Sequence, residues 1–187
     1  MDTNSLKIIC YTGGTCGDLV TALIDPVGAA LNSELGTVTH AADRAKLKKP
    51  HLFNNSLEKA NYLLEVSGHY RSIPSHDLDF HVEQQHDFIS ITVKDLTVAV
   101  WAAERFKKCH RPHVWAEMQK VCGAESIEDY ANILIHYSNM VQKHTNKLIR
   151  LEDIVSGQVI DVLQNLINTE LSDHSKNFYQ AWLDMQQ

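Results

Sequence analysis

The residues with the clearest chemical potential form a glycine-rich stretch from Tyr11 to Asp18, which reads Tyr-Thr-Gly-Gly-Thr-Cys-Gly-Asp. An apolar run over 6–11 precedes this stretch, and an apolar segment over 19–24 follows it. The order predicts a strand, a tight loop and a helix. The free amides at a helix start, together with the conformational freedom of glycine, suit such a loop to phosphate or sulfate. An ordinary turn between strand and helix is the alternative for the same pattern.

Polar side chains stand at the carboxyl ends of three further predicted strands. The three predicted strands cover 71–76, 87–93 and 147–151. The polar residues at their carboxyl ends are His76, Lys94 and Glu152, respectively. Ligands bind beyond the carboxyl ends of strands in open parallel sheets, so these positions favour an anion site shared with the glycine-rich loop. Histidine takes a proton from a hydroxyl group near neutral pH, which makes His76 a candidate base. A surface or capping histidine is the alternative.

Several of these candidates also have structural interpretations. Lys94 is either an anion ligand or an exposed turn lysine. Glu152 and Asp153 either orient His76 or a substrate, or occupy the start of the next helix, where acidic residues are favoured. Cys16 lies close to a predicted helix start, a position that favours reactive thiols, but no histidine partner is assignable to it.

The stretch from His76 to Asp87 is rich in histidine and aspartate. Such residues bind zinc, manganese or iron, and in an extended segment Asp77, Asp79 and His81 would share one face. A metal-dependent hydrolase is therefore a rival hypothesis. A solvated polar loop is the favoured interpretation of the stretch, and no metal ligand is assigned.

Apolar spacing and capping residues predict the helices, with Ser126 opening a capping-box-like sequence. The predicted helices cover 18–24, 56–65, 96–108, 112–122, 126–144, 157–168 and 173–186, while 27–50 is ambiguous. Aromatic residues at helical spacing are assigned to the core; they are Trp101, Phe106, Trp115, Tyr130, Tyr137, Phe178 and Trp182. The alternation of strands and helices predicts one α/β domain over 1–187, with a mainly parallel sheet flanked by helices.

Composition and charge exclude several classes of protein. The net charge of −6 argues against nucleic-acid binding, and the basic cluster Arg105–Lys108 is interpreted as a solvated helix face. No apolar run approaches the roughly 20 residues of a membrane span, and the polar start of the chain lacks the pattern of a signal peptide. The four cysteines form no CxxC pair, which indicates thiols in a reducing cytoplasm.

Three segments, in this order, resemble the P-loop sulfotransferase family. They are Tyr11–Leu19, Ser75–Leu78 and Ile89–Leu96, with a weaker fourth match over Leu148–Ile154. The resemblance implies a three-layer P-loop-type domain that transfers a sulfuryl group from the nucleotide PAPS to a hydroxyl acceptor, with His76 as the base. Small phage-encoded proteins with this sort of glycine loop are also similar, so the cytoplasm would be that of a host if the protein is viral.

The resemblance also implies which residues bind PAPS or its product PAP. They are Thr12, Gly13, Gly14, Thr15, Cys16 and Gly17 in the loop, and Thr92 and Lys94 after the third segment. The chain departs from the family, because its loop has no lysine or arginine, and Ile91 and Ala99 replace the arginine and serine that bind the 3′-phosphate. A non-catalytic protein of the same fold, which binds a nucleotide, another anion or a protein partner, is therefore the alternative.

Overall fold

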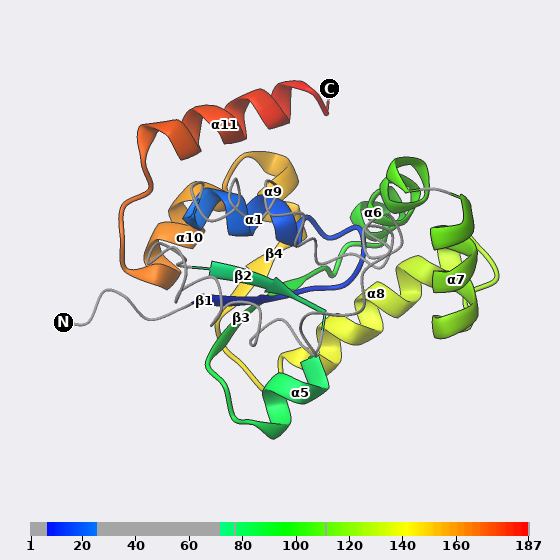
Figure 1. Cartoon of the computed structure of the whole chain (residues 1–187). Coiled ribbons are helices and arrows are strands. Elements are labelled where there is room, and N and C mark those ends of the chain that lie inside the picture. Colours follow the sequence, from blue (N-terminus) through cyan, green and yellow to red (C-terminus); the bar gives the residue numbers. More distant parts are fainter. Residues whose placement is uncertain (1–6, 26–71, 77, 111, 187) are drawn as a thin grey trace, which may run out of the picture. The chain divides into compact units, whose positions relative to one another are not determined.

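The computed structural model describes residues 7–25, 72–76, 78–110 and 112–186 (Figure 1). The ambiguous segment 27–50 and the helix expected over 56–65 lie outside these residues. The described part is an α/β structure with four strands and eight helices. The strands are β1 (Lys7–Cys10), β2 (Ser72–Ser75), β3 (Phe88–Thr92) and β4 (Leu148–Arg150). The helices are α1 (Gly17–Ile24), α5 (Leu78–Glu83), α6 (Leu96–Cys109), α7 (Pro112–Cys122), α8 (Ile127–Val141), α9 (Leu151–Ser156), α10 (Val159–Ile167) and α11 (Asp173–Asp184).

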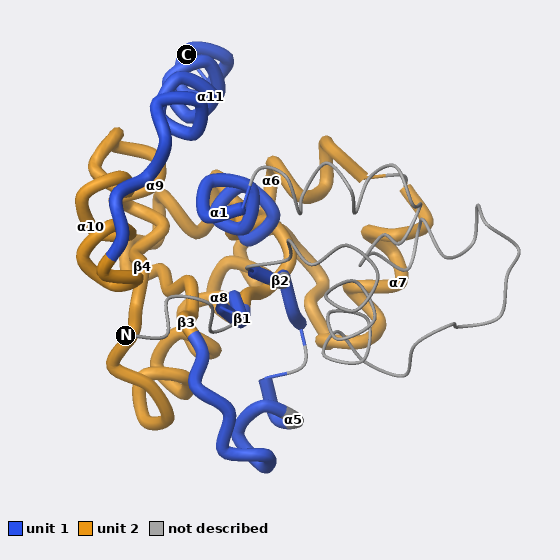
Figure 2. The backbone as a smooth tube through the Cα atoms, turned by 60° about the vertical axis from the view of Figure 1, so that its left-hand side comes forward, with its two compact units in different colours: residues 1–10, 17–88, 169–187 blue, residues 11–16, 89–168 orange. Residues whose placement is uncertain are grey.

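The chain forms two compact units, coloured separately in Figure 2. Unit 1 contains residues 1–10, 17–88 and 169–187, and unit 2 contains residues 11–16 and 89–168. β1 and β2 belong to unit 1, and β3 and β4 belong to unit 2. The single domain over the whole chain stays a prediction.

In unit 1, β1 and β2 pair in parallel and lie side by side (Figure 1). Ile9 stands opposite Pro74, and Cys10 stands opposite Ser75. Ile8, Ile9 and Cys10 are buried, which confirms that β1 is covered on both faces.

Helix α1 packs against β1, β2 and α11 within unit 1. Its buried face includes Leu19, Val20 and Leu23, which confirms the helix expected after the glycine-rich loop. The Ser72 hydroxyl donates a hydrogen bond to the Thr21 carbonyl over 3.0 Å. This bond ties the start of β2 to the middle of α1.

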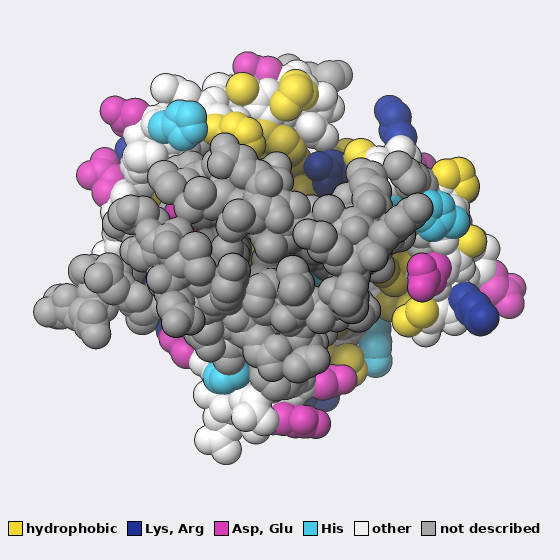
Figure 3. Space-filling model, in the orientation of Figure 1, with side chains coloured by type: hydrophobic (Ala, Val, Ile, Leu, Met, Phe, Trp, Pro, Cys, Tyr) yellow, Lys and Arg dark blue, Asp and Glu magenta, His cyan; other side chains and the backbone are white. Residues whose placement is uncertain are grey.

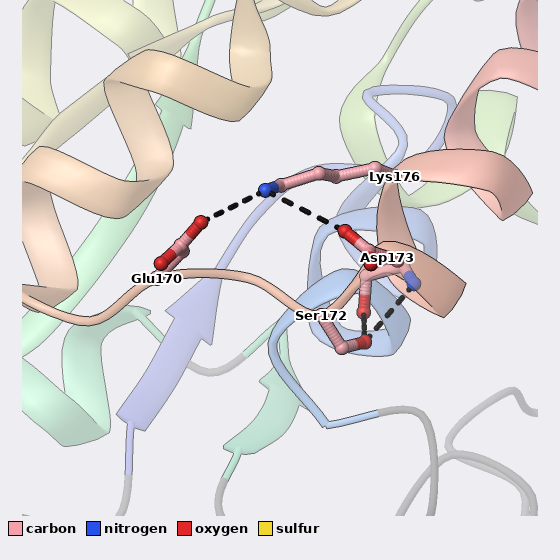
Figure 4. Close-up of polar contacts among 5 residues, drawn as sticks. Glu170, Ser172, Asp173 and Lys176 are labelled. Carbon is pink, nitrogen blue, oxygen red and sulfur yellow. Dashed lines mark hydrogen bonds and ion pairs between the residues drawn. The ribbon is translucent and has the colours of Figure 1, made fainter.

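Helix α11 begins with a side-chain cap. Ser172 Oγ accepts the Ser175 amide over 3.1 Å, and Lys176 Nζ lies 3.2 Å from Glu170 Oε1 and 4.0 Å from Asp173 Oδ1 (Figure 4). Acidic residues at a helix start also interact favourably with the helix dipole. These contacts fix the entry of the chain into α11.

The two faces of α11 differ in burial. Tyr179 and Trp182 are buried, and their rings stack with centroids 6.1 Å apart. Phe178 and Met185 are 45% and 74% exposed, and apolar side chains are visible over α11 at the top of Figure 3. The assignment of Phe178 to the core is therefore wrong, because it lies on the outer face of the helix.

In unit 2, β3 and β4 pair in parallel, with Ile91 opposite Ile149. The strand expected over 87–93 is confirmed as β3, and all five of its residues are buried. Helices α9 and α10 pack with β4, while α6 packs along α8 and α7 contacts both. The buried face of α6 is made of small residues and one ring, which are Ala99, Ala102, Ala103 and Phe106.

Two helices of unit 2 begin with side-chain caps. Asp95 caps α6, and its carboxylate accepts the Val98 amide over 3.0 Å. Ser126 and Asp129 form a reciprocal capping box at the start of α8, which confirms the expected signal. No helix in the described part of the chain is long and apolar enough to cross a membrane.

Candidate functional site

The glycine-rich loop forms a tight turn between β1 and α1. The Thr15 amide and hydroxyl both donate to the Thr12 carbonyl, over 3.2 Å and 2.8 Å. Gly14 has a φ of 91° and Cys16 a φ of 63°, both in the left-handed region. Glycine adopts this conformation without strain, so the turn explains why residue 14 is glycine. Thr15 is buried, and its donors are used within the loop.

The loop packs against α6 and α8 within unit 2. A Cβ atom on Gly13 would lie 2.7 Å from the Phe106 ring and 2.9 Å from Tyr130 Oη. A Cβ atom on Gly14 would lie 2.5 Å from the carbonyl oxygen of Ala102. Packing against these helices therefore excludes a side chain at both positions, and this is a sufficient physical reason for the glycine pair.

Tyr130 anchors the loop from α8. Its hydroxyl donates to the Gly13 carbonyl over 3.2 Å, and its ring stacks with that of Phe106 at a centroid distance of 5.8 Å. Trp115 meets the Tyr130 ring edge-on at 5.4 Å. Burial, with a further electrostatic contribution from Cys122, raises the pKa of the Tyr130 hydroxyl well above its usual value. The phenol therefore stays protonated and remains a donor to the loop.

A cation reaches the loop from α6. Arg105 Nη1 lies 3.6 Å from Cys16 Sγ, and its guanidinium lies over the Trp101 ring at 5.8 Å. Arg105 is half-buried, so the interpretation of this residue as part of a solvated basic face is wrong. Sequence reasoning missed its proximity to the loop. The one local signal is the i, i+4 spacing of Trp101 and Arg105, which places them on one side of a helix.

Thr92 and Lys94, the other expected nucleotide ligands, lie at the end of β3. Thr92 is buried, and its hydroxyl donates to the Ile149 carbonyl over 3.4 Å. The amides of Lys94 and Asp95 both donate to Glu152 Oε1, over 2.7 Å and 2.8 Å. The Lys94 residue itself is exposed.

Glu152 therefore joins two elements of unit 2. It lies in the first turn of α9, yet its carboxylate binds the turn that leads from β3 into α6. Its Oε2 atom is buried and has no hydrogen-bond partner within the described part of the chain. The carboxylate fixes the backbone at Lys94, rather than capping its own helix as the sequence suggested.

The expected site residues are divided between the two units. Residues 12–16, Thr92 and Lys94 belong to unit 2, and there the loop is in contact with Arg105. Gly17 and His76 belong to unit 1. Gly17 begins α1 and its carbonyl accepts the Thr21 hydroxyl, while His76 is exposed just after β2.

The histidine-rich stretch folds differently from its expected form. Residues 78–83 form α5, so the extended arrangement proposed for Asp79 and His81 is wrong, and Asp77 lies outside the described residues. His81 is 0% exposed, so the interpretation as a solvated loop is also wrong for this residue. No group of three or more histidine, cysteine, aspartate or glutamate residues suited to a metal ion occurs among the described residues.

His81 is instead part of a chain of polar side chains that sequence reasoning missed. Its Nε2 lies 2.8 Å from Ser75 Oγ, and its Nδ1 lies 3.0 Å from His86 Nδ1. The turn after α5 brings His86 back onto the helix, because the amides of Gln85 and His86 donate to the carbonyls of Val82 and His81. This pair of bonds, with Gln85 at a φ of 54°, is a Schellman C-cap.

Comparisons of the chain with protein-family models, with curated proteins and with solved structures find no significant match in any of the three.

Proposed function

We propose that the protein is a divergent P-loop protein of the sulfotransferase type, which binds PAPS at residues 12–17 and transfers its sulfuryl group to a hydroxyl acceptor. The order of the three sequence segments supports this proposal, as does the parallel pairing of the strands that carry them. A three-layer P-loop architecture and a cytoplasmic location are parts of the same proposal. The acceptor is a small molecule or a protein that presents a hydroxyl group.

The proximity of Arg105 to the loop carries the proposal. Phosphoryl-type transfer, which sulfuryl transfer resembles, depends on positive charge near the bridging and terminal oxygens. The loop has no lysine or arginine of its own, but the Arg105 guanidinium lies 3.6 Å from the sulfur of Cys16 in the loop. Guanidinium groups bind phosphate and sulfate through paired hydrogen bonds. Arg105 therefore supplies the charge that the loop sequence lacks.

Calorimetric titration with PAP tests the binding step. We expect the unmodified protein to bind PAP, and Arg105→Gln to weaken binding at least about tenfold, which corresponds to about 1.4 kcal/mol. Lys107→Gln is the matched control, because Lys107 lies on the same helix, is exposed, and faces the Trp115 ring at 5.8 Å. Absence of binding at millimolar PAP would overturn the proposal, as would equal losses in the two variants.

A transfer assay tests the role of His76. With PAPS and a panel of phenols and alcohols, we expect His76→Ala to abolish turnover while leaving the affinity for PAP unchanged, because a base acts on the acceptor rather than on the donor. His113→Ala, which removes another exposed histidine, is the control. Turnover that survives His76→Ala would remove this residue from the mechanism.

A non-catalytic protein of the same fold, which binds an anion or a protein partner, is the second candidate. The packing of Gly13 and Gly14 against Phe106 and Ala102 favours it, because this packing requires both glycines without any ligand. PAP binding without turnover on any acceptor would support this candidate. Turnover that depends on His76 would exclude it.

A further inference from the structure

Three side chains of unit 1 form a continuous hydrogen-bonded chain. Ser75 is the last residue of β2, His81 lies on α5, and His86 follows the turn after that helix. The contacts are 2.8 Å from Ser75 Oγ to His81 Nε2, and 3.0 Å from His81 Nδ1 to His86 Nδ1. A hydroxyl group is thus joined to one imidazole, which is joined in turn to a second.

The surroundings hold the His81 ring in place. The ring is fully buried, and its centroid lies 6.4 Å from that of Phe88 and 5.3 Å from that of His86. The Schellman cap after α5 fixes the backbone that carries His86. Ser75 is fixed by its pairing with Cys10 of β1. The three polar groups are therefore preorganised by a strand, a helix and a helix cap.

The chemistry of neutral imidazole determines what this chain does. Each neutral ring has one N–H group and one nitrogen lone pair. When His81 donates its Nδ1 hydrogen to His86, its Nε2 lone pair faces the Ser75 hydroxyl and accepts that proton. In the opposite tautomer His86 donates to His81, and Nε2–H donates to Ser75 Oγ. The chain therefore conducts a proton between the serine oxygen and the second histidine.

We propose that Ser75 is a nucleophile toward activated carboxylic esters, with His81 as its base and His86 as the residue that positions His81. A nucleophile hydrogen-bonded to a base, which is itself oriented by a third group, is the arrangement that such catalysis requires. Ser75 is 1% exposed, but the next residue, His76, is exposed, so β2 ends at the surface. The proposal therefore requires that a substrate reach the hydroxyl from this end of the strand.

The reaction balances without a cofactor. Ser75 Oγ forms a bond to the ester carbonyl carbon, and the hydroxyl proton passes to His81 Nε2. The bond to the alcohol breaks, and the alcohol leaves with the proton from His81. Water then attacks the acyl-serine by the same route, which releases the carboxylic acid and restores the serine hydroxyl.

A fluorophosphonate probe tests the proposal on the full-length protein. The serine oxygen bonds to phosphorus, fluoride leaves, and peptide mass spectrometry locates the label. We expect the label on Ser75, its loss in Ser75→Ala, and its retention in Ser72→Ala, which removes another buried serine of the same strand. The rate of labelling should fall at least about 100-fold in His81→Gln, as expected when a general base is removed.

The positioning role of His86 is tested by a measurement that distinguishes it from a purely structural role. His86→Ala should slow labelling, and His86→Asn should restore much of the rate, because the asparagine oxygen accepts the Nδ1 hydrogen of His81.

Thermal unfolding and circular dichroism of each variant identify those that fail to fold. An unlabelled but folded native protein overturns the proposal, and so does labelling that persists in a folded His81→Gln. A stoichiometric transition metal on the two histidines, found by native mass spectrometry, overturns it as well.

Discussion

The hydroxyl group of Tyr130 donates a hydrogen bond to the carbonyl oxygen of Gly13, a residue 117 positions earlier in the sequence. The same phenol lies over the Phe106 ring, which fills the space that a side chain at position 13 would need. The conformation of the loop is therefore coupled to the packing of α6 and α8. A substitution in this small core changes the loop as well as the stability of unit 2.

Tyr130→Phe tests the anchoring of the loop. The variant keeps the ring but removes the donor to the buried Gly13 carbonyl, so we expect a loss of about 1–2 kcal/mol in the free energy of unfolding. Urea denaturation at pH 7 measures this loss. Tyr137→Phe, at a half-buried tyrosine of the same helix, is the control. Equal stabilities of native protein and Tyr130→Phe would show that the hydrogen bond contributes nothing.

The stability of the native protein should also decrease in alkali because of Tyr130. Burial raises the pKa of this phenol in the folded state, whereas in the unfolded chain it ionises near pH 10. The unfolded state therefore loses a proton first, and the free energy of unfolding falls as the pH rises above about 10. Urea denaturation between pH 8 and pH 11, by our estimate the useful window, should show a smaller decrease in Tyr130→Phe. Parallel curves for the two proteins would contradict this assignment.

Gly14→Ala should destabilise the protein strongly. The residue has a φ of 91°, and an added Cβ atom would lie 2.5 Å from the backbone oxygen of Ala102. We expect a loss of about 3 kcal/mol, because backbone strain and steric overlap add. Gly123→Ala is the matched control, with a φ of 72° and open space around the added atom. It should cost only about 1 kcal/mol, so similar losses in the two variants would rule out the contact with α6 as the cause.

Glu152→Ala should release the turn between β3 and α6. The variant removes two charge-assisted hydrogen bonds to the amides of Lys94 and Asp95, so we expect a loss of about 2–3 kcal/mol. Amide hydrogen exchange at these two residues should accelerate in the variant. Glu117→Ala, at an exposed position on α7, should change stability by less than about 0.5 kcal/mol. Unchanged exchange at Lys94 and Asp95 would contradict the proposed role of the carboxylate.

The main elements were predictable because their local signals agree. Apolar runs rich in β-branched residues mark β1 and β3. The long helices carry apolar faces, and Ser126 marks the start of α8 as a recognisable cap. The short helices α5 and α9 were missed, because six residues are too few to form a stable helix on their own. Contacts with the rest of the protein stabilise them.

The candidate sites were less predictable, because they depend on contacts between distant residues. The glycine pattern indicated a tight loop, but the need for a glycine at position 13 comes from Phe106, on a helix much later in the chain. The position of Arg105 beside Cys16 likewise depends on a contact between residues far apart in the sequence. His81 lay in a polar stretch, and only the Schellman turn, with a glutamine in the left-handed conformation, brings it together with His86. Glutamine gives little sequence signal for such a turn.

The division of the chain has a consequence for its synthesis on the ribosome. Unit 2 is complete once residue 168 has left the exit tunnel, whereas unit 1 still lacks residues 169–187, which include α11. Helix α1 is translated long before its partner α11, so the surface of α1 that α11 covers stays uncovered by that helix until residues 169–187 have been made. Neither unit corresponds to a continuous stretch of the gene, and a stalled or truncated product would lack the closing helix of the first unit.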